Sequence, residues 1–150
     1  MDSQAPHDAV EEWINQNNVF GDNATVRREV TYGNSRFDFC IESGDSTAFL
    51  EVKGVTLEKD GLALFPDAPT LRGVKHIEEL ISCAREGFGA YIIFVVQMKG
   101  VTALSPNDAM HPQFGDALRR AQKAGVNILA YDCLVDTHGF TIDAPIPVIL

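Results

Sequence analysis

The stretch SRFDFCIESGDSTAFLEVKGV, residues 35–55, decides the fold, because it contains two strand-like runs separated by a turn. The first run, SRFDFCIES, begins at Ser35, and the second, TAFLEVKGV, begins at Thr47. Both runs are rich in aromatic and β-branched residues, which favour strands. The segment ESGDS between them carries the glycine and short polar residues of a turn. The two runs therefore predict an antiparallel hairpin.

Side chains alternate between the two faces of a strand, so the first run can be divided by face. Phe37 and Phe39 are expected to face the core together, because large aromatic side chains are usually buried. Arg36 and Asp38 then face the other way.

In the second run, Glu51 and Lys53 share one face of the strand, while Leu50 and Val52 face the other way. In a hairpin, Asp38 lies beside Glu51, which brings two carboxylates and an ammonium group together. Adjacent carboxylates raise each other's pKa unless a cation lies between them, and hard divalent ions prefer such oxygen ligands. The alternative is an exposed strand face with weak ion pairs. Spacing alone favours this alternative, because the pattern D…ExK is short and arises by chance.

The residues before this hairpin predict a helix and a further strand. Val10, Trp13 and Ile14 recur at helical spacing, with Asp8 as a candidate cap. The run TVRREVTYG, from Thr25, has strand character.

The residues after the hairpin alternate between helical and strand patterns. An apolar stripe from Leu71 to Ala84 predicts a helix, and residues 112–124 predict a second. The runs AYIIFVVQM and VNILAYDCLV are continuously apolar, as in strands covered on both faces. The tail APIPVIL suits an edge strand or a loop. The predicted order is αβββαβαβ, an α/β fold.

Composition limits the class of protein. With 150 residues, 45% of them hydrophobic, the chain is expected to form a single domain spanning residues 1–150. Its 21 acidic and 12 basic residues give a net charge of −9, which taken alone argues against nucleic acid. Three widely spaced cysteines without a CxxC pair favour a reducing compartment, and no segment is apolar enough to span a membrane. A cytoplasmic protein is expected.

Five strings resemble the sugar fermentation stimulation protein A (SfsA) family and occur in that family's order. They are REVTYGNSRFDF, FLEVKGVTL, FPDAPTLRGVKHIEEL, LSPNDAMHPQF and AGVNILAYD. The resemblance implies a restriction-endonuclease-like, PD-(D/E)XK nuclease-like domain, with an αβββαβ core and a mixed central sheet flanked by helices. Members similar to this chain usually carry an OB-like domain before the nuclease-like part. We expect that domain to be absent here, because the chain begins too late to contain it.

The family's PD-(D/E)XK signature carries over onto Asp38, Glu51 and Lys53, each the same residue type here. By resemblance, Asp38, Glu51 and the carbonyl of Val52 would hold magnesium or manganese, and Lys53 would orient a water or stabilise charge on phosphorus. The alternative role of Lys53 is a salt bridge to either carboxylate. The first element of the signature would come from Glu11 or Glu12 on the N-terminal helix.

A basic stripe borders this predicted site. Arg72, Lys75 and His76 share one face of the predicted helix, and Arg36 shares the strand face of Asp38. The two arginines and Lys75 suit phosphate binding, although the stripe equally suits an ordinary solvated helix face. His76 is the weakest member, since a hydrogen-bonded histidine is as common as a proton carrier.

The other histidines, His7, His111 and His138, lack partners at ligand spacing and are interpreted as surface residues.

Two functions follow from the resemblance. The first is a magnesium- or manganese-dependent nuclease acting on DNA or another nucleic acid. The second is a non-enzymatic, non-specific DNA-binding regulator of sugar (maltose) metabolism. Because Arg36, Lys53, Arg72 and Lys75 fall in segments that are expected to build or border the predicted site, acidity does not exclude a phosphate substrate. It predicts weak, metal-dependent binding by this chain alone.

Overall fold

The structure, a computed structural model, describes residues 4–150. Its helices are α1 (Ala5–Asn17), α2 (Leu71–Arg85) and α3 (Pro112–Ala124). Its strands are β1 (Thr25–Tyr32), β2 (Ser35–Ser43), β3 (Ser46–Val55), β4 (Leu57–Lys59), β5 (Leu62–Phe65), β6 (Gly89–Val96), β7 (Ala103–Pro106), β8 (Asn127–Asp136) and β9 (Gly139–Pro145). None of the helices in this range is long and apolar enough to cross a membrane.

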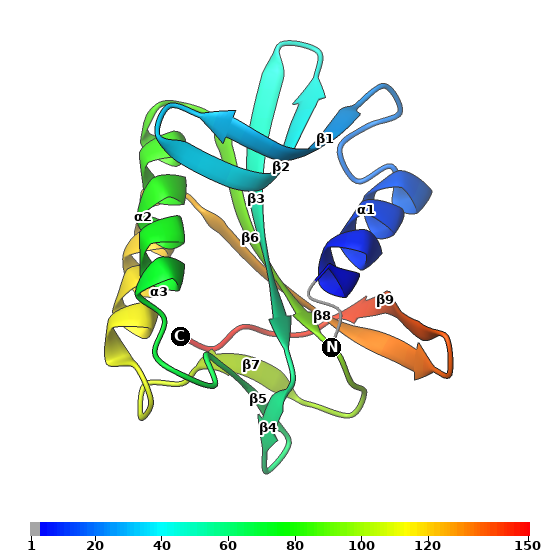
Figure 1. The fold of residues 1–150 in the computed structure, drawn as a ribbon, viewed down its shortest axis with the longest axis vertical. Helices are drawn as coiled ribbons and strands as arrows, with labels where there is room; N and C mark the ends of the chain where they lie inside the picture. Colours follow the sequence, from blue (N-terminus) through cyan, green and yellow to red (C-terminus); the bar gives the residue numbers. More distant parts are fainter. Residues whose placement is uncertain (1–3) are drawn as a thin grey trace.

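A mixed six-stranded sheet forms the centre of the molecule, in the order β1-β2-β3-β6-β8-β9 (Figure 1). The strands β1, β2 and β3 form the predicted antiparallel meander. The pairs β3–β6 and β6–β8 are parallel, with α2 and α3 as their crossovers, and β9 returns antiparallel to β8. The α/β class and the mixed sheet with flanking helices are confirmed.

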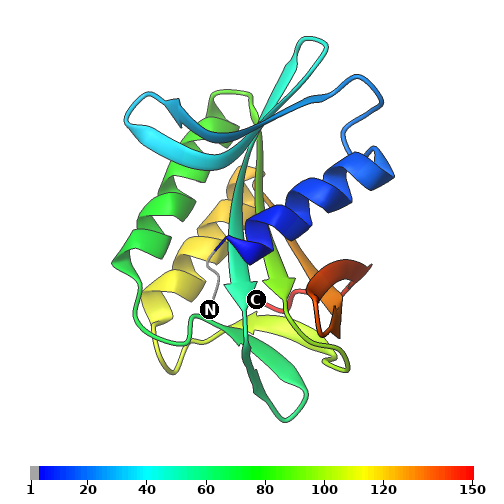
Figure 2. The same cartoon turned by 45° about the vertical axis from the view of Figure 1, so that its right-hand side comes forward.

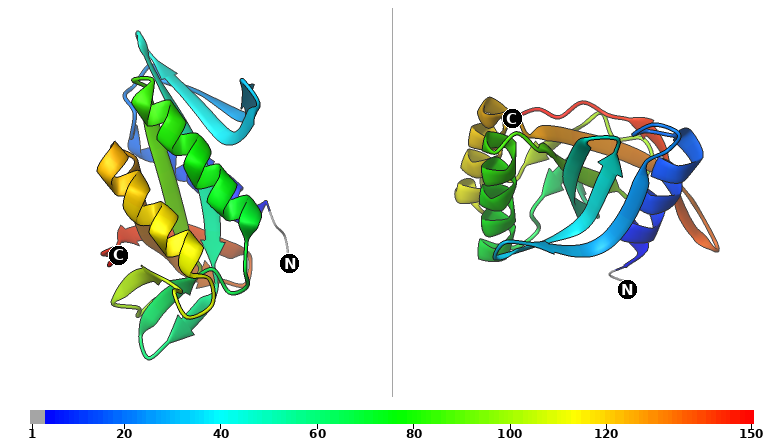
Figure 3. Two further views of the ribbon diagram at one scale, coloured as in Figure 1. Left: turned by 90° about the vertical axis from the view of Figure 1, so that its left-hand side faces the viewer. Right: turned by 90° about the horizontal axis from the view of Figure 1, so that it is seen from above.

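Helices cover both faces of this sheet, as Figure 3 shows from above. On one face, Ile77 and Leu80 of α2 pack with Phe114 and Leu118 of α3 in the larger apolar cluster. On the other face, α1 lies against the sheet through its buried Val10 in a second cluster (Figure 2). Each fully buried side chain of this size stabilises the fold by about 1.5–3 kcal/mol.

The strand β6 lies between these two clusters. Its residues Ile92, Phe94 and Val96 belong to the cluster under α2 and α3, while Ile93 and Val95 belong to the cluster under α1. The prediction of a central strand covered on both faces is confirmed.

The prediction that β8 is covered on both faces holds only for the middle of the strand. Ala130 and Cys133 are buried, but Leu134 and Val135 are more than half exposed near the turn into β9. The tail APIPVIL contains both predicted forms: Ala144 and Pro145 end the edge strand β9, which pairs with β8 alone in the sheet, and residues 146–150 lie outside the strands. The earlier part of β9, from Gly139, was not predicted as a strand.

A second, three-stranded sheet of β4, β5 and β7 was not predicted. These strands are three or four residues long and lie next to Gly61 and Pro66, which read as a loop in the sequence. Ser105, in the family string LSPNDAMHPQF, belongs to β7.

The start of α1 also differs from the prediction. The helix begins at Ala5 with a proline in its first turn, so Asp8 lies inside it rather than at its cap. Asp8 instead accepts a hydrogen bond from Arg28 of β1, 2.7 Å away.

Candidate functional site

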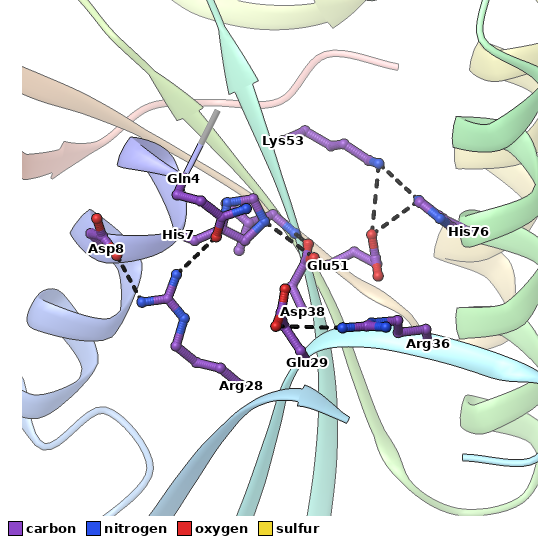
Figure 4. A network of polar contacts seen from close by, with 11 residues as sticks. Gln4, His7, Asp8, Arg28, Glu29, Arg36, Asp38, Glu51, Lys53 and His76 are labelled. Atoms are coloured by element: carbon purple, nitrogen blue, oxygen red, sulfur yellow. Dashed lines mark hydrogen bonds and ion pairs between the residues drawn. The ribbon is translucent and has the colours of Figure 1, made fainter. Parts of the chain in front are cut away.

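A cleft of about 660 Å³ lies where β2 and β3 part, between the first turn of α1 and the first turns of α2. It is lined by eight of the residues that the sequence singled out, which come from β2, β3 and α2. They are Arg36, Asp38, Glu51, Val52, Lys53, Arg72, Lys75 and His76. Residues distant in the sequence are thus brought together, as Figure 4 shows for most of them.

The strands β2 and β3 separate at the cleft. Their ladder pairs Phe39 with Leu50 and ends there, although the same register continued by one residue would set Asp38 opposite Glu51. The backbone N–H of Val52 instead donates to Oδ2 of Asp38 at 2.8 Å. The side-chain carboxylate of Asp38 therefore takes the place of a backbone carbonyl as acceptor for this N–H. This hydrogen bond holds Asp38 where β2 and β3 separate.

The neighbouring strand carries a backbone irregularity at the same level. The β1–β2 ladder pairs Arg28 with Phe39 and Val30 with Phe37, and it passes over Glu29 and Asp38. Glu29 has a φ of 53°, a left-handed conformation that costs a non-glycine residue about 1–2 kcal/mol. The strain lies beside the cleft, where strained residues tend to cluster in functional sites.

Because of this distortion, simple alternation fails in β2. Phe37 packs in the cluster under α2 and α3, whereas Phe39 packs in the cluster under α1. The expectation that the two aromatic residues face one side was wrong, since the β1–β2 ladder is interrupted at Glu29 and Asp38, between them. Asp38 itself is 25% exposed and faces the cleft.

Glu51 is the most deeply buried charged group of the cleft, with 1% of its surface exposed. Its Oε2 lies 3.1 Å from Nδ1 of His76 and 3.6 Å from Nζ of Lys53. The predicted sharing of one face by Glu51 and Lys53 therefore matches the geometry. Burying a carboxylate is costly unless it is paired, and these two neighbours supply the pairing.

His76 joins both of its neighbours through one ring nitrogen, because Nδ1 also lies 2.9 Å from Nζ of Lys53. A ring nitrogen either carries a hydrogen or accepts one. Nδ1 therefore either donates a hydrogen bond to Glu51 or accepts one from Lys53, but not both at once. The position of one proton therefore decides how Lys53 and Glu51 are held. In Figure 4, His76 approaches both residues from α2.

His7 of α1 approaches Asp38 from the opposite side of the cleft. Its Nε2 lies 3.1 Å from Oδ1 of Asp38, and its side chain is 19% exposed. The interpretation of His7 as a surface residue was wrong. Its sequence neighbours gave no signal, because the contact depends on how α1 docks onto the sheet.

The surroundings of Asp38 lower the pKa of its carboxyl group. Burial acts in the opposite direction and is the largest single influence. The hydrogen bonds from His7 and the Val52 N–H, together with the charges of His7 and Lys53, outweigh it. Asp38 is therefore held as an anion at the cleft.

The remaining histidines differ from one another. His111 is buried at the start of α3, with 6% exposed, so its interpretation as a surface residue was wrong as well. His138 is exposed in the turn between β8 and β9, as predicted.

The acidic residues expected from α1 lie elsewhere. Glu11 is 3.3 Å from Arg28, and Glu12 accepts a hydrogen bond from Gln16 on the solvent side. Neither lines the cleft, to which the start of α1 contributes His7 together with Gln4, the residue just before the helix.

The basic residues fall into two groups. Arg72 and Lys75 are exposed at the rim on α2. Arg36 lies 3.4 Å from Glu29 rather than beside Asp38, and both of these side chains are more than half exposed. Glu29 was not predicted as part of the cleft, because its contact depends on the distortion in β1.

The donor atoms of the cleft suit a hard cation with an incomplete protein shell. Within residues 4–150, no three His, Cys, Asp or Glu side chains converge closely enough to hold a metal ion by themselves. Four carboxylates line the cleft, and two of them, from Asp38 and Glu51, come from the separated strands β2 and β3. Mg²⁺ is commonly held by one or two carboxylates and keeps several of its waters, so this donor set fits such an ion.

The fold and the cleft define an α/β protein with a mixed six-stranded sheet, helices on both faces, and a polar cleft where two strands part. A family model described as "Sugar fermentation stimulation protein RE domain" matches residues 4–139. The chain belongs to the sugar fermentation stimulation protein (SfsA) family, as the five strings predicted.

The relatives include sugar fermentation stimulation protein homologs from two clostridial species. The protein from Clostridium beijerinckii is 51% identical over 150 residues, which is 100% of this chain and 66% of that protein. The protein from Ruminiclostridium cellulolyticum is 50% identical over 148 residues, again 66% of its length. The chain thus spans slightly less than two thirds of these relatives.

A solved structure, described as Pyrococcus furiosus SfsA in complex with Ca²⁺, is similar over 99% of this chain and 66% of that one. The TM-score is 0.90, at 30% sequence identity.

Proposed function

We propose that this chain is a divalent-cation-dependent, nuclease-like phosphodiesterase domain of the PD-(D/E)XK type, with nucleic acid as its substrate. The observation that carries the proposal is the convergence of Asp38, Glu51 and Lys53 on one cleft. The order α1-β1-β2-β3-α2-β6 supports it, since this is the αβββαβ core with the short β4–β5 hairpin inserted.

The cation would be held by Asp38, Glu51 and the carbonyl of Val52. We expect Mg²⁺ or Mn²⁺ in the cell, because both take hard oxygen ligands. The Ca²⁺ complex of the Pyrococcus relative supports a divalent cation in this family. When bound, such an ion polarises a phosphoryl oxygen and acidifies a coordinated water.

The chain's own residues have separate tasks in this reaction. Lys53, one strand period beyond Glu51, orients the attacking water and stabilises charge on the phosphoryl oxygens. Arg72 and Lys75 bind flanking phosphates at the rim, and Arg36 does so once it leaves Glu29. Water attacks phosphorus, and the bond from phosphorus to the leaving oxygen breaks. The attacking water gives up a proton to solvent or a group in the cleft, and the leaving oxygen takes a proton from solvent to become a hydroxyl.

Calorimetry with MnCl₂ tests the cation site. We expect binding to the wild-type chain and none to the Asp38→Asn/Glu51→Gln double variant, which keeps the size of both side chains. Equal heats for the two proteins would refute the site.

Cleavage of a plasmid and of a labelled oligonucleotide tests the activity. We expect nicking in Mn²⁺ that is lost in Lys53→Ala and in the double variant. Nicking that persists unchanged in Lys53→Ala would remove Lys53 from the mechanism. A mobility shift without metal, with no cleavage on adding metal, would favour the non-enzymatic DNA-binding regulator.

A further inference from the structure

The contact between His7 and Asp38 joins α1 to the candidate cation site. Nε2 of His7 lies 3.1 Å from Oδ1, and the N–H of Val52 lies 2.8 Å from Oδ2. Each oxygen of Asp38 thus has its own partner, one from a helix and one from a strand. A carboxylate held at both oxygens has a fixed plane, so its lone pairs point in fixed directions.

Three contacts keep His7 in this position. Arg28 of β1 donates to Asp8 at 2.7 Å and to Gln4 at 3.1 Å, on either side of His7 in the first turn of α1. The imidazole ring also stacks on Phe39, with ring centroids 6.5 Å apart.

The sheet also limits how far this turn can move. A Cβ atom on Gly54 of β3 would lie only 2.9 Å from Cγ of Pro6, so the backbone of β3 and the start of α1 are in close contact. The sheet therefore limits the movement of His7, and the contact of His7 with Asp38 limits the movement of that carboxylate in turn.

We propose that His7 is a positioning residue that fixes Asp38 for divalent-cation binding, a role that rests on the proposed function. Partners that orient a metal-ligating side chain typically change metal affinity by about 10–100-fold when they are removed. His7 thus makes the contribution from α1 that the sequence assigned to Glu11 or Glu12.

The test is Mn²⁺ affinity measured by calorimetry for two His7 variants. His7→Phe keeps a ring against Phe39 but removes the hydrogen bond, and we expect binding weakened about 10-fold or more. His7→Gln sets an amide N–H near the position of Nε2, and we expect affinity within about threefold of wild type. His138→Gln, at an exposed turn, is the matched control and is expected to bind like wild type.

Two results would contradict this role, and a third would refute the cation site on which it rests. Wild-type or tighter affinity in His7→Phe would show that Asp38 needs no positioning. An equal loss of Mn²⁺ affinity in His7→Gln and His7→Phe would show that His7 acts through packing and not through its hydrogen bond to Asp38. Wild-type affinity in Asp38→Asn/Glu51→Gln would instead refute the cation site, so failure of the proposed function is distinguished from failure of the role of His7.

Discussion

Glu51 and Asp38 line the same cleft in different electrostatic settings. Glu51 is 1% exposed and is paired with Lys53, its neighbour on β3, and with His76 of α2. Asp38 is partly exposed and is paired with His7, from the side of α1. A cation binding to both carboxylates would exchange these ion pairs for metal–oxygen contacts. The cation therefore competes with Lys53, His76 and His7 for the two carboxylates.

The lowered pKa of Asp38 predicts a pH dependence of stability in the metal-free protein. A carboxyl whose pKa is lower when folded stabilises the fold above its unfolded pKa, near 3.8, and this contribution is lost as pH falls through the folded pKa. Between about pH 5 and pH 2, the free energy of unfolding should therefore fall more steeply in wild type than in Asp38→Asn.

Urea denaturation in EDTA at several pH values measures this difference. The other carboxylates titrate in both proteins, so only the difference between the two pH profiles is informative. Parallel profiles would contradict the assignment of Asp38 as a stabilised anion.

At the residue scale, the sequence predicted Asp38, Glu51 and Lys53 as one group, because a two-residue strand period and a short turn determine their relative placement. It could not predict His7. That contact depends on the docking of a separate helix, through Arg28 and Pro6, which no local pattern encodes. It also missed the twist at Glu29, because glutamate rarely adopts a left-handed conformation.

At the element scale, the contact of α1 with β3 predicts a packing conflict. In Gly54→Ala, the new Cβ would lie 2.7 Å from Nε2 of Gln97 and 2.9 Å from Cγ of Pro6. The glutamine can rotate away, but the proline ring cannot, so we expect a loss of about 1–3 kcal/mol in the free energy of unfolding. Pro6→Ala removes Cγ and should recover part of that loss.

A double-mutant cycle by urea denaturation measures this coupling. The combined variant should be more stable than the sum of the single changes implies. Simple additivity would show that α1 does not lie against Gly54.

The helix α2 presents the basic rim of the cleft. Replacing Arg72 and Lys75 by alanine should weaken DNA binding and reduce the slope of log affinity against log salt by about 2. Lys59→Ala/Lys123→Ala removes the same charge at two exposed residues outside the cleft and is the matched control. Fluorescence anisotropy in Ca²⁺ at several salt concentrations measures both slopes. Equal slopes for the two double variants would remove α2 from the binding surface.

The longer elements were predictable because their periodic patterns extend over eight or more residues, as in α3 and β6. The strands β4, β5 and β7 were not, since three or four residues carry too little pattern. The strands β5 and β7 pair although Leu62–Phe65 and Ala103–Pro106 are far apart in the sequence, and β4 joins them through a short hairpin with β5.

At the scale of the whole molecule, the net charge of −9 is unevenly distributed. The cleft is lined by four Lys or Arg residues and by four Asp or Glu residues, so its formal charge cancels. Much of the acidic excess therefore lies elsewhere, as in Asp132 and Asp143, which share Lys99 near β9. A bound divalent cation would make the cleft positive, which is why we expect nucleic-acid binding to depend on metal.

The two-layer core also predicts unreactive thiols. All three cysteines are buried, and burial raises the pKa of Cys83 to about 11 and that of Cys133 to about 12. Burial also raises the pKa of Cys40. Because only the thiolate reacts, Ellman's reagent at pH 8 should label none of the three in the native protein and all three in urea. Rapid labelling of the native protein would contradict the packing of both faces.

The central claim is that Asp38 and Glu51 bind one divalent cation, and a crystal soaked in MnCl₂ tests it most directly. Data collected at the manganese absorption edge should contain an anomalous peak between the two carboxylates, with Glu51 released from Lys53 and His76. A cleft without a peak, in which His7 still pairs with Asp38 and Glu51 with Lys53, would contradict the claim.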